Sequence, residues 1–125
     1  MGVQLLEAMA HGLPVITVLA GEFIEHLTES DANLMLSEIH RILGERGRFL
    51  LTTPNPQGIN FRLKRMSVIG GAHLSQYTPR QLRTALHQQG FDHVRLLGSG
   101  RMTRHLGDRA RPFWLYGSCL AVADV

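Results

Sequence analysis

Pro14-Val-Ile-Thr-Val-Leu-Ala20 is a nearly continuous apolar run, rich in β-branched residues. Such a run is typical of a strand covered on both faces, as in a parallel sheet. A second run of the same kind, Arg48-Phe-Leu-Leu-Thr-Thr53, follows an amphipathic segment at residues 30–43. Two buried strands joined by a helix predict a right-handed crossover, and therefore an α/β fold.

The segment between these strands has the apolar spacing of a helix. Met35, Ile39 and Ile42 fall on one stripe, and either Ser30 or Asp31 is a suitable N-cap. This predicts a helix that begins near residue 30 and ends at the glycines that follow residue 43.

A second helix is predicted from Thr78-Pro79-Arg80-Gln81. The threonine and glutamine can form a capping box, and proline suits the first helical position. We expect this helix to close at Gly90, with strands at residues 91–97 and 116–122 and a polar loop at 98–112 between them. A helical turn is expected at 61–66 and a short helix at 2–11. The fold predicted is a sheet of about four strands with helices on both faces and an antiparallel last strand.

Size and charge indicate one soluble domain. The chain has 125 residues, a net charge of +3 and a single cysteine, which fits a reducing, cytoplasmic location. It shows no signal peptide and no apolar run long enough to span a bilayer. Five arginines fall between Arg95 and Arg111. We predict a solvated loop rather than a nucleic-acid site, because no aromatic platform or recognition helix accompanies them.

Five sequence blocks resemble a known family. Leu19-Ala-Gly-Glu-Phe-Ile-Glu-His-Leu27 is similar to the fourth-strand motif, E-x-x-E-H-L, of class I S-adenosylmethionine-dependent methyltransferases. The other similar blocks, in the family's order, are Ser37–Leu43, Arg48–Asn55, His73–Pro79 with Gly90-Phe91, and Ser118–Ala123. The resemblance covers residues 19–125 and implies the C-terminal half of a partial Rossmann-like domain, with S-adenosylmethionine as cofactor.

The family's glycine-rich cofactor loop has no counterpart before Leu19. The resemblance therefore implies a truncated domain that binds the cofactor poorly and has little or no activity alone. Residues 5–16, which read LLEAMAHGLPVI, resemble instead the LEAMAxGxPVI block of GT-B-fold glycosyltransferases. In that family a glutamate matching Glu7 bonds the nucleotide ribose. We hypothesise that residues 1–18 are a foreign segment, joined to the methyltransferase-like part near residues 14–20.

Ligands of open α/β sheets bind beyond the carboxyl ends of the strands. The resemblance places the cofactor there, against Ala20, Gly21 and Glu22. Methyl transfer needs an in-line nucleophile and a base for its proton. The candidates for that base and for positioning the acceptor are Glu22, His26 and His73.

The resemblance also implies substrate-binding residues, namely Asn55, His73 and Tyr77. Each candidate has a structural alternative: His26 can brace its loop, Tyr77 can mark a helix entry and Asn55 can form a turn. Glu25 is expected to be structural. Seven histidines are present, but none shows the spacing of H-x-x-x-H or H-E-x-x-H, so we predict no metal site.

The function implied is S-adenosylmethionine-dependent methyl transfer to a small-molecule, lipid or saccharide acceptor. No nucleic-acid partner and no integral membrane contact are predicted. Two alternatives stay open. One is a non-catalytic module that forms a homodimer, or recruits a complementing chain, through a strand edge at Val15–Leu19. The other is a glycosyltransferase fragment, which rests on residues 5–16 alone.

Overall fold

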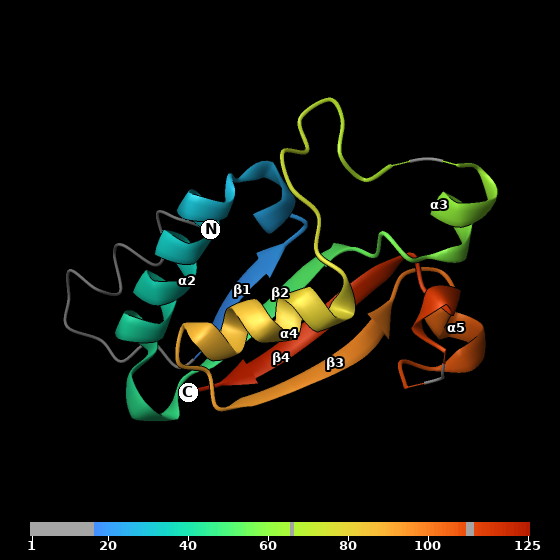
Figure 1. Cartoon of the computed structure of the whole chain (residues 1–125). Helices are drawn as coiled ribbons and strands as arrows, with labels where there is room; N and C mark the ends of the chain where they lie inside the picture. Colours follow the sequence, from blue (N-terminus) through green and yellow to red (C-terminus); the bar gives the residue numbers. More distant parts are fainter. Residues whose placement is uncertain (1–16, 66, 110–111) are drawn as a thin grey trace.

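The described residues form one mixed sheet with the strand order β1-β2-β4-β3 (Figure 1). The computed structural model describes residues 17–65, 67–109 and 112–125. Strands β1 and β2 run parallel, and β4 is antiparallel to both of its neighbours, β2 and β3. The four strands and the antiparallel last strand are therefore confirmed. The strand bounds are β1 (Thr17–Gly21), β2 (Arg48–Pro54), β3 (His93–Ser99) and β4 (Ser118–Asp124).

Helix α2 (Glu29–Leu43) connects β1 to β2. Its N-cap is Thr28, whose Oγ1 accepts a hydrogen bond of 3.2 Å from the amide of Asp31. The expectation of a cap at Ser30 or Asp31 is wrong, because the chain turns helical earlier. Asp31 lies inside the first turn, where its carboxylate accepts a bond from the Thr28 hydroxyl at 2.8 Å and complements the helix dipole.

Helix α4 (Pro79–Gln88) begins at the predicted capping box. Gln81 donates its amide to Thr78 Oγ1 at 3.2 Å, and its side-chain oxygen accepts from the Thr78 amide at 3.0 Å. Leu82 and Leu86 on its inner face are fully buried. Here the local sequence alone determines where the helix begins.

The core lies on one face of the sheet. In register, Val18 pairs with Phe49 and Ala20 with Leu51, and these side chains pack with buried residues of both α2 and α4. Helices on both faces were expected, but the two long helices among the described residues share one face. The reason is topological, because two right-handed crossovers that advance in the same direction across a sheet place their helices on the same side.

Shorter elements cap the ends of the strands. A 3₁₀ turn, η1 (Ile24–His26), follows β1, and α3 (Ile59–Leu63) follows β2 near the helical turn predicted at 61–66. The loop predicted at 98–112 contains one helical turn, α5 (Thr103–Leu106). The remaining 3₁₀ turns are η2 (Gly44–Arg46) and η3 (Phe113–Leu115).

None of the helices in the described ranges is long and apolar enough to cross a membrane. The expected helix at 2–11, the glycosyltransferase-like stretch at 5–16 and the first part of the proposed junction at 14–20 lie outside the described residues, which begin at residue 17.

Candidate functional site

Strands β1 and β2 end at the same edge of the sheet. The Glu22 amide, directly after β1, donates to the Thr52 carbonyl oxygen at 2.9 Å and lies 3.1 Å from Thr52 Oγ1. Asn55 directly follows β2. Glu22 and Asn55 therefore leave the sheet at the same edge, as parallel neighbours require.

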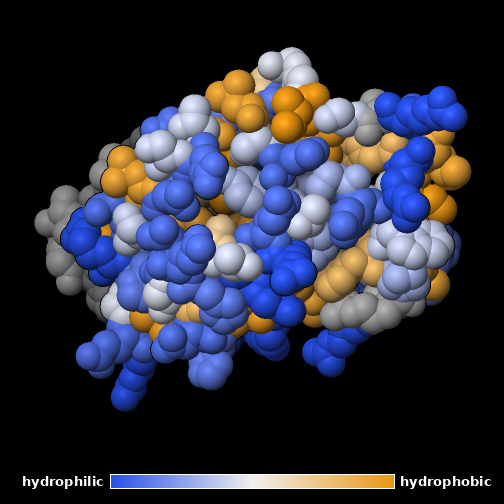
Figure 2. Space-filling view, in the orientation of Figure 1, coloured by the Kyte–Doolittle hydropathy of each residue, from blue (hydrophilic) through white to orange (hydrophobic). Residues whose placement is uncertain are grey.

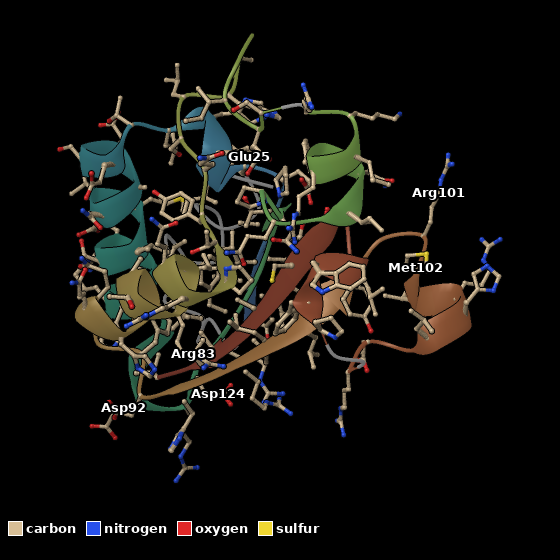
Figure 3. All side chains as sticks on the ribbon, turned by 45° about the vertical axis from the view of Figure 1, so that its right-hand side comes forward. Glu25, Arg83, Asp92, Arg101, Met102 and Asp124 are labelled. Carbon is tan, nitrogen blue, oxygen red and sulfur yellow. The ribbon has the colours of Figure 1, made fainter. Side chains whose placement is uncertain are left out.

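Glu25, in η1, is buried at this edge of the sheet (Figure 3). Its side chain is 0% exposed, and its Oε2 accepts a hydrogen bond from Thr53 Oγ1 at 3.1 Å. Its Oε1 is also buried and has no hydrogen-bond partner among the described residues. A carboxylate oxygen buried without a partner destabilises the fold. A proton shared with Glu22, whose side chain also forms a hydrogen bond with Glu25, or a bound ligand would satisfy this atom. Glu25, expected to be structural, is therefore a site candidate.

Two imidazoles lie beside this carboxylate. The rings of His26 and His73 meet edge to face with centroids 4.7 Å apart. Their Nδ1 atoms lie 3.0 Å from the Ala72 carbonyl oxygen and 2.9 Å from the Val68 carbonyl oxygen, respectively. A carbonyl can only accept, so we assign the proton to Nδ1 in both rings. In the neutral imidazole, Nε2 then keeps a free lone pair on each ring.

The loop that carries His73 is tied to η1 by the backbone. The amides of Leu74 and Ser75 both donate to the carbonyl oxygen of Glu25, at 2.8 and 3.1 Å. Ser75 Oγ reaches the Ile24 carbonyl oxygen at 3.3 Å. These bonds hold His73 against the strand end although it is distant from His26 in the sequence.

Glu25, His26 and His73 each offer one ligand atom, and these atoms lie within 4.8 Å of one another. We call these three residues the carboxylate–imidazole cluster. Two imidazoles and a carboxylate suit a divalent first-row transition metal. Nδ1 atoms bonded to backbone carbonyls are the usual outer support of metal-binding histidines. The search for short ligand spacings missed this group, because η1 and a distant loop supply its members.

Glu22 lies next to this cluster. Partial burial raises the pKa of its carboxyl above the ordinary value of 4.5, the negative charge of Glu25 and a hydrogen bond with the Glu25 side chain raise it further, and hydrogen bonds with Ser118 and Thr52 oppose the rise. Its backbone is also unusual, because φ is 47°, in the left-handed region that few non-glycine residues adopt. Two neighbouring carboxylates that repel each other are a common arrangement around a cation.

Asn55 does not serve the predicted substrate-binding role. It is 0% exposed, and its Nδ2 donates to the carbonyl oxygens of Phe113 and Tyr116 at 3.0 and 3.1 Å. Its Oδ1 accepts from the Gln57 amide at 3.1 Å. With these groups occupied and no surface exposed, Asn55 instead ties the end of β2 to the segment before β4.

Three other predicted residues lie around the site rather than in the cluster. Tyr77 lines a polar groove between α2 and α4 together with Glu29, and burial raises the pKa of its hydroxyl. Ala20 turns its side chain into the core, so only its main chain can meet a cofactor. Gly21 is exposed, and a Cβ added there would meet only Thr52 Oγ1, at 3.6 Å. A ligand can therefore approach its backbone closely.

No family model matches the chain, and no curated protein matches its sequence. Solved structures do match its fold. A SAM-dependent methyltransferase from Archaeoglobus fulgidus is similar with a TM-score of 0.66 and 16% identity, over 90% of this chain and 60% of that one. The small RNA methyltransferase HEN1 is similar with a TM-score of 0.64 and 19% identity, over 87% of this chain and 14% of that one.

A third similar structure is the magnesium protoporphyrin IX methyltransferase ChlM from Synechocystis PCC 6803 with bound SAH. Its TM-score is 0.57 at 19% identity, over 89% of this chain and 45% of that one. The chain has a partial Rossmann-like fold that matches part of these SAM-dependent methyltransferase structures. At these identities the likeness concerns the fold alone, and the chain spans 14–60% of the length of these three proteins. These matches lend the glycosyltransferase resemblance no support.

Proposed function

We propose that this chain forms the acceptor side of a SAM-dependent methyltransferase site, and that Glu25, His26 and His73 hold a divalent cation against an acceptor hydroxyl. The observation that carries the proposal is the buried, unpartnered carboxylate oxygen of Glu25 beside two imidazoles fixed by backbone carbonyls. The methyltransferase-like fold supports it, because the cluster occupies the carboxyl edge of the sheet, where ligands of such folds bind.

The residues at this edge of the sheet fit both the S-adenosylmethionine cofactor and a divalent cation. The open approach to the Gly21 backbone and the exposed Glu22 suit the cofactor, which supplies an activated methyl group on sulfur. The cluster suits a cation, which lowers the pKa of a bound hydroxyl. In this proposal the imidazoles act as ligands rather than as bases.

Glu22 is then the group that accepts the proton of the acceptor hydroxyl. A carboxyl whose pKa is raised toward the working pH is a better general base than an ordinary one. The acceptor is a small-molecule, lipid or saccharide hydroxyl, since oxygen donors bind divalent cations readily.

Calorimetry with Mn²⁺ and with S-adenosylhomocysteine tests the two halves separately. We expect one Mn²⁺ per chain, with binding abolished or strongly weakened in His73→Ala and unchanged in His93→Ala, an exposed histidine at the start of β3. Equal Mn²⁺ affinity in all three proteins would contradict the cation site. S-adenosylhomocysteine binding that is weakened by Gly21→Val would support a cofactor at the end of β1, and binding indifferent to that change would oppose it.

A second candidate, homodimerisation or recruitment of a complementing chain through β1, rests on a different observation. Among the described strands β1 pairs with β2 only, and Leu19 on it is 50% exposed. Edge strands of this kind recruit partners. Sedimentation velocity at increasing concentration tests it: a dimer weakened by Leu19→Lys supports the candidate, and a monomer at all concentrations opposes it.

A further inference from the structure

Charge is divided unevenly along this chain. Residues 48–125 carry eleven of the 13 lysines and arginines but only three of the 10 acidic residues. Several of these cations lie on or beside α3 and α5, the two short helices at the right of Figure 1. The basic residues on and beside α3 and at the start of α5 are Arg62, Lys64, Arg65, Arg101 and Arg104. Beyond α5, Arg109 and Asp108 lie 3.9 Å apart and offset each other's charge.

The same region exposes large apolar side chains. Leu63 is 75% exposed, Leu106 42%, Trp114 38% and Met102 37%. Leu63 and Trp114 line one depression of about 370 Å³ together with Arg62. Figure 2 shows apolar and strongly hydrophilic residues beside each other over α3. Figure 3 shows Arg101 and Met102 at the start of α5, with the Arg101 side chain extended away from the ribbon. We call the four apolar residues and these five cations the α3–α5 surface.

Hydrogen bonds fix the backbone segments that carry these exposed apolar side chains. Tyr116 donates its hydroxyl to the Gly107 carbonyl oxygen at 2.6 Å, which ties the end of α5 to the segment that carries Trp114. Asn55 ties that segment to the loop before α3 through the Phe113 and Tyr116 carbonyl oxygens. The apolar side chains are thus presented by an ordered backbone.

We propose that the α3–α5 surface docks on the interface of a bilayer that contains anionic lipids. Apolar side chains flanked by arginine and lysine are what such an interface binds, since the chains enter the acyl boundary and the cations meet the headgroups. A second copy of this chain fits less well, because two such basic surfaces repel each other. A single-stranded nucleic acid binds through cations and through aromatic rings on which its bases stack. Of the four apolar side chains only Trp114 is aromatic, so the other three would have no part in such a complex.

The α3–α5 surface and the carboxylate–imidazole cluster lie beyond the same ends of the strands, because η1 follows β1, α3 follows β2 and α5 follows β3. Phe23, Ile69 and Leu74, on the segments around the cluster, are 48%, 49% and 59% exposed. A bilayer against the α3–α5 surface would then lie near the mouth of the site. If the proposed function holds, this placement selects a lipid or lipid-linked hydroxyl among the three acceptor classes; the docking itself does not depend on catalysis.

Trp114 is the only tryptophan in the chain and reports on this surface directly. We expect its emission to shift to the blue when vesicles of phosphatidylcholine and phosphatidylglycerol are added to the full chain, and to change little with phosphatidylcholine alone. The shift should weaken with salt, because screening reduces attraction between exposed charges.

Leu63→Ser should weaken binding to the anionic vesicles about tenfold, since it removes one large side chain from the apolar contact. Leu34→Ser is the matched control: Leu34 is 63% exposed on α2, outside this surface. Arg101→Glu should also weaken binding, and Arg46→Glu, in η2, should not. Circular dichroism checks that each variant folds.

Three results would overturn the proposal. The first is the absence of a blue shift and of co-sedimentation with anionic vesicles. The second is equal loss of binding in Leu63→Ser and Leu34→Ser. The third is a Trp114 response to a single-stranded oligonucleotide but not to vesicles, which would assign the surface to nucleic acid. Because vesicle binding needs no Mn²⁺, failure here is distinguishable from failure of the proposed function.

Discussion

The carboxylate–imidazole cluster and the α3–α5 surface depart from the usual rules of folding in opposite directions. The cluster buries a carboxylate oxygen that has no partner among the described residues. The surface exposes Leu63, Trp114 and other large apolar side chains. Neither arrangement stabilises the chain by itself, and such departures tend to mark functional sites. The comparison teaches that the two regions depart from the rules in opposite ways, an unpaired buried carboxylate oxygen in one and uncovered apolar surface in the other, and this is why we propose a different ligand for each.

The largest effect should come from His26→Ala. Removing one of the three proposed protein ligands should lower Mn²⁺ affinity by about 100-fold or more, since even the loss of an outer-shell partner of a ligand costs about 10- to 100-fold, while vesicle binding stays unchanged. Calorimetry and co-sedimentation on the same protein measure both. If His26→Ala impaired both properties equally, the two regions would not be separate sites.

Gly98→Ala should weaken vesicle binding and leave Mn²⁺ binding unchanged. A Cβ at Gly98 would overlap the ring of Tyr116, the residue that holds α5. We expect the free energy of unfolding to fall by about 2 kcal/mol, as for other overpacked sites, and vesicle binding to weaken. Chemical denaturation gives the first value, and Mn²⁺ calorimetry on the folded variant should be unaffected. Unchanged stability and unchanged vesicle binding would show that Tyr116 does not organise the surface.

Glu25→Gln separates stability from binding within the cluster. It removes a buried charge and its repulsion of Glu22, so metal-free protein should gain about 1 kcal/mol of stability. The same change should weaken Mn²⁺ binding. A variant that is less stable than the parent in the absence of metal would mean that Glu25 is a structural residue.

The smallest effect concerns the pH dependence of metal-free protein. The pKa of Glu22 is raised above 4.5 by partial burial and by Glu25, so the native state holds its proton more tightly than the unfolded state. The stability that Glu22 contributes is fully present below the pKa that its carboxyl has in the unfolded chain. It is lost as the pH rises through the higher pKa of the same carboxyl in the folded chain. The melting temperature should therefore fall slightly above pH 4.5, and Glu22→Gln should remove that part of the fall.

Glu45→Gln, an exposed change in η2, is the control for this pH profile and should leave it unchanged. A Glu22→Gln profile identical to that of the parent would show that the Glu22 pKa is ordinary.

Local sequence signals determined much of the fold. The capping box at Thr78 and the apolar runs of β1 and β2 depend only on residues that are close together in the sequence. The strands and α4 could therefore be predicted within a few residues. The cap of α2 was misplaced because Thr28, Ser30 and Asp31 are all capable N-caps, and only the incoming turn selects one.

The site was predicted only in part, for a physical reason. Glu22, His26 and His73 lie at one edge of the sheet, but the role that we propose for Glu25 rests on its burial, which the sequence pattern does not show. Asn55 was misassigned for the same reason. A polar residue after a strand can face a ligand or bond the backbone, and here Phe113 and Tyr116, far along the chain, occupy its amide.

The most direct test of the central claim is an electron paramagnetic resonance titration of the full chain with Mn²⁺, followed by pulsed detection of nitrogen couplings. The account predicts one bound Mn²⁺ per chain with couplings from two imidazole nitrogens, and one coupling fewer in any His26→Ala complex that forms. A spectrum of free hexaaquo Mn²⁺ at equimolar, millimolar concentrations, or a bound ion without nitrogen couplings, would contradict it.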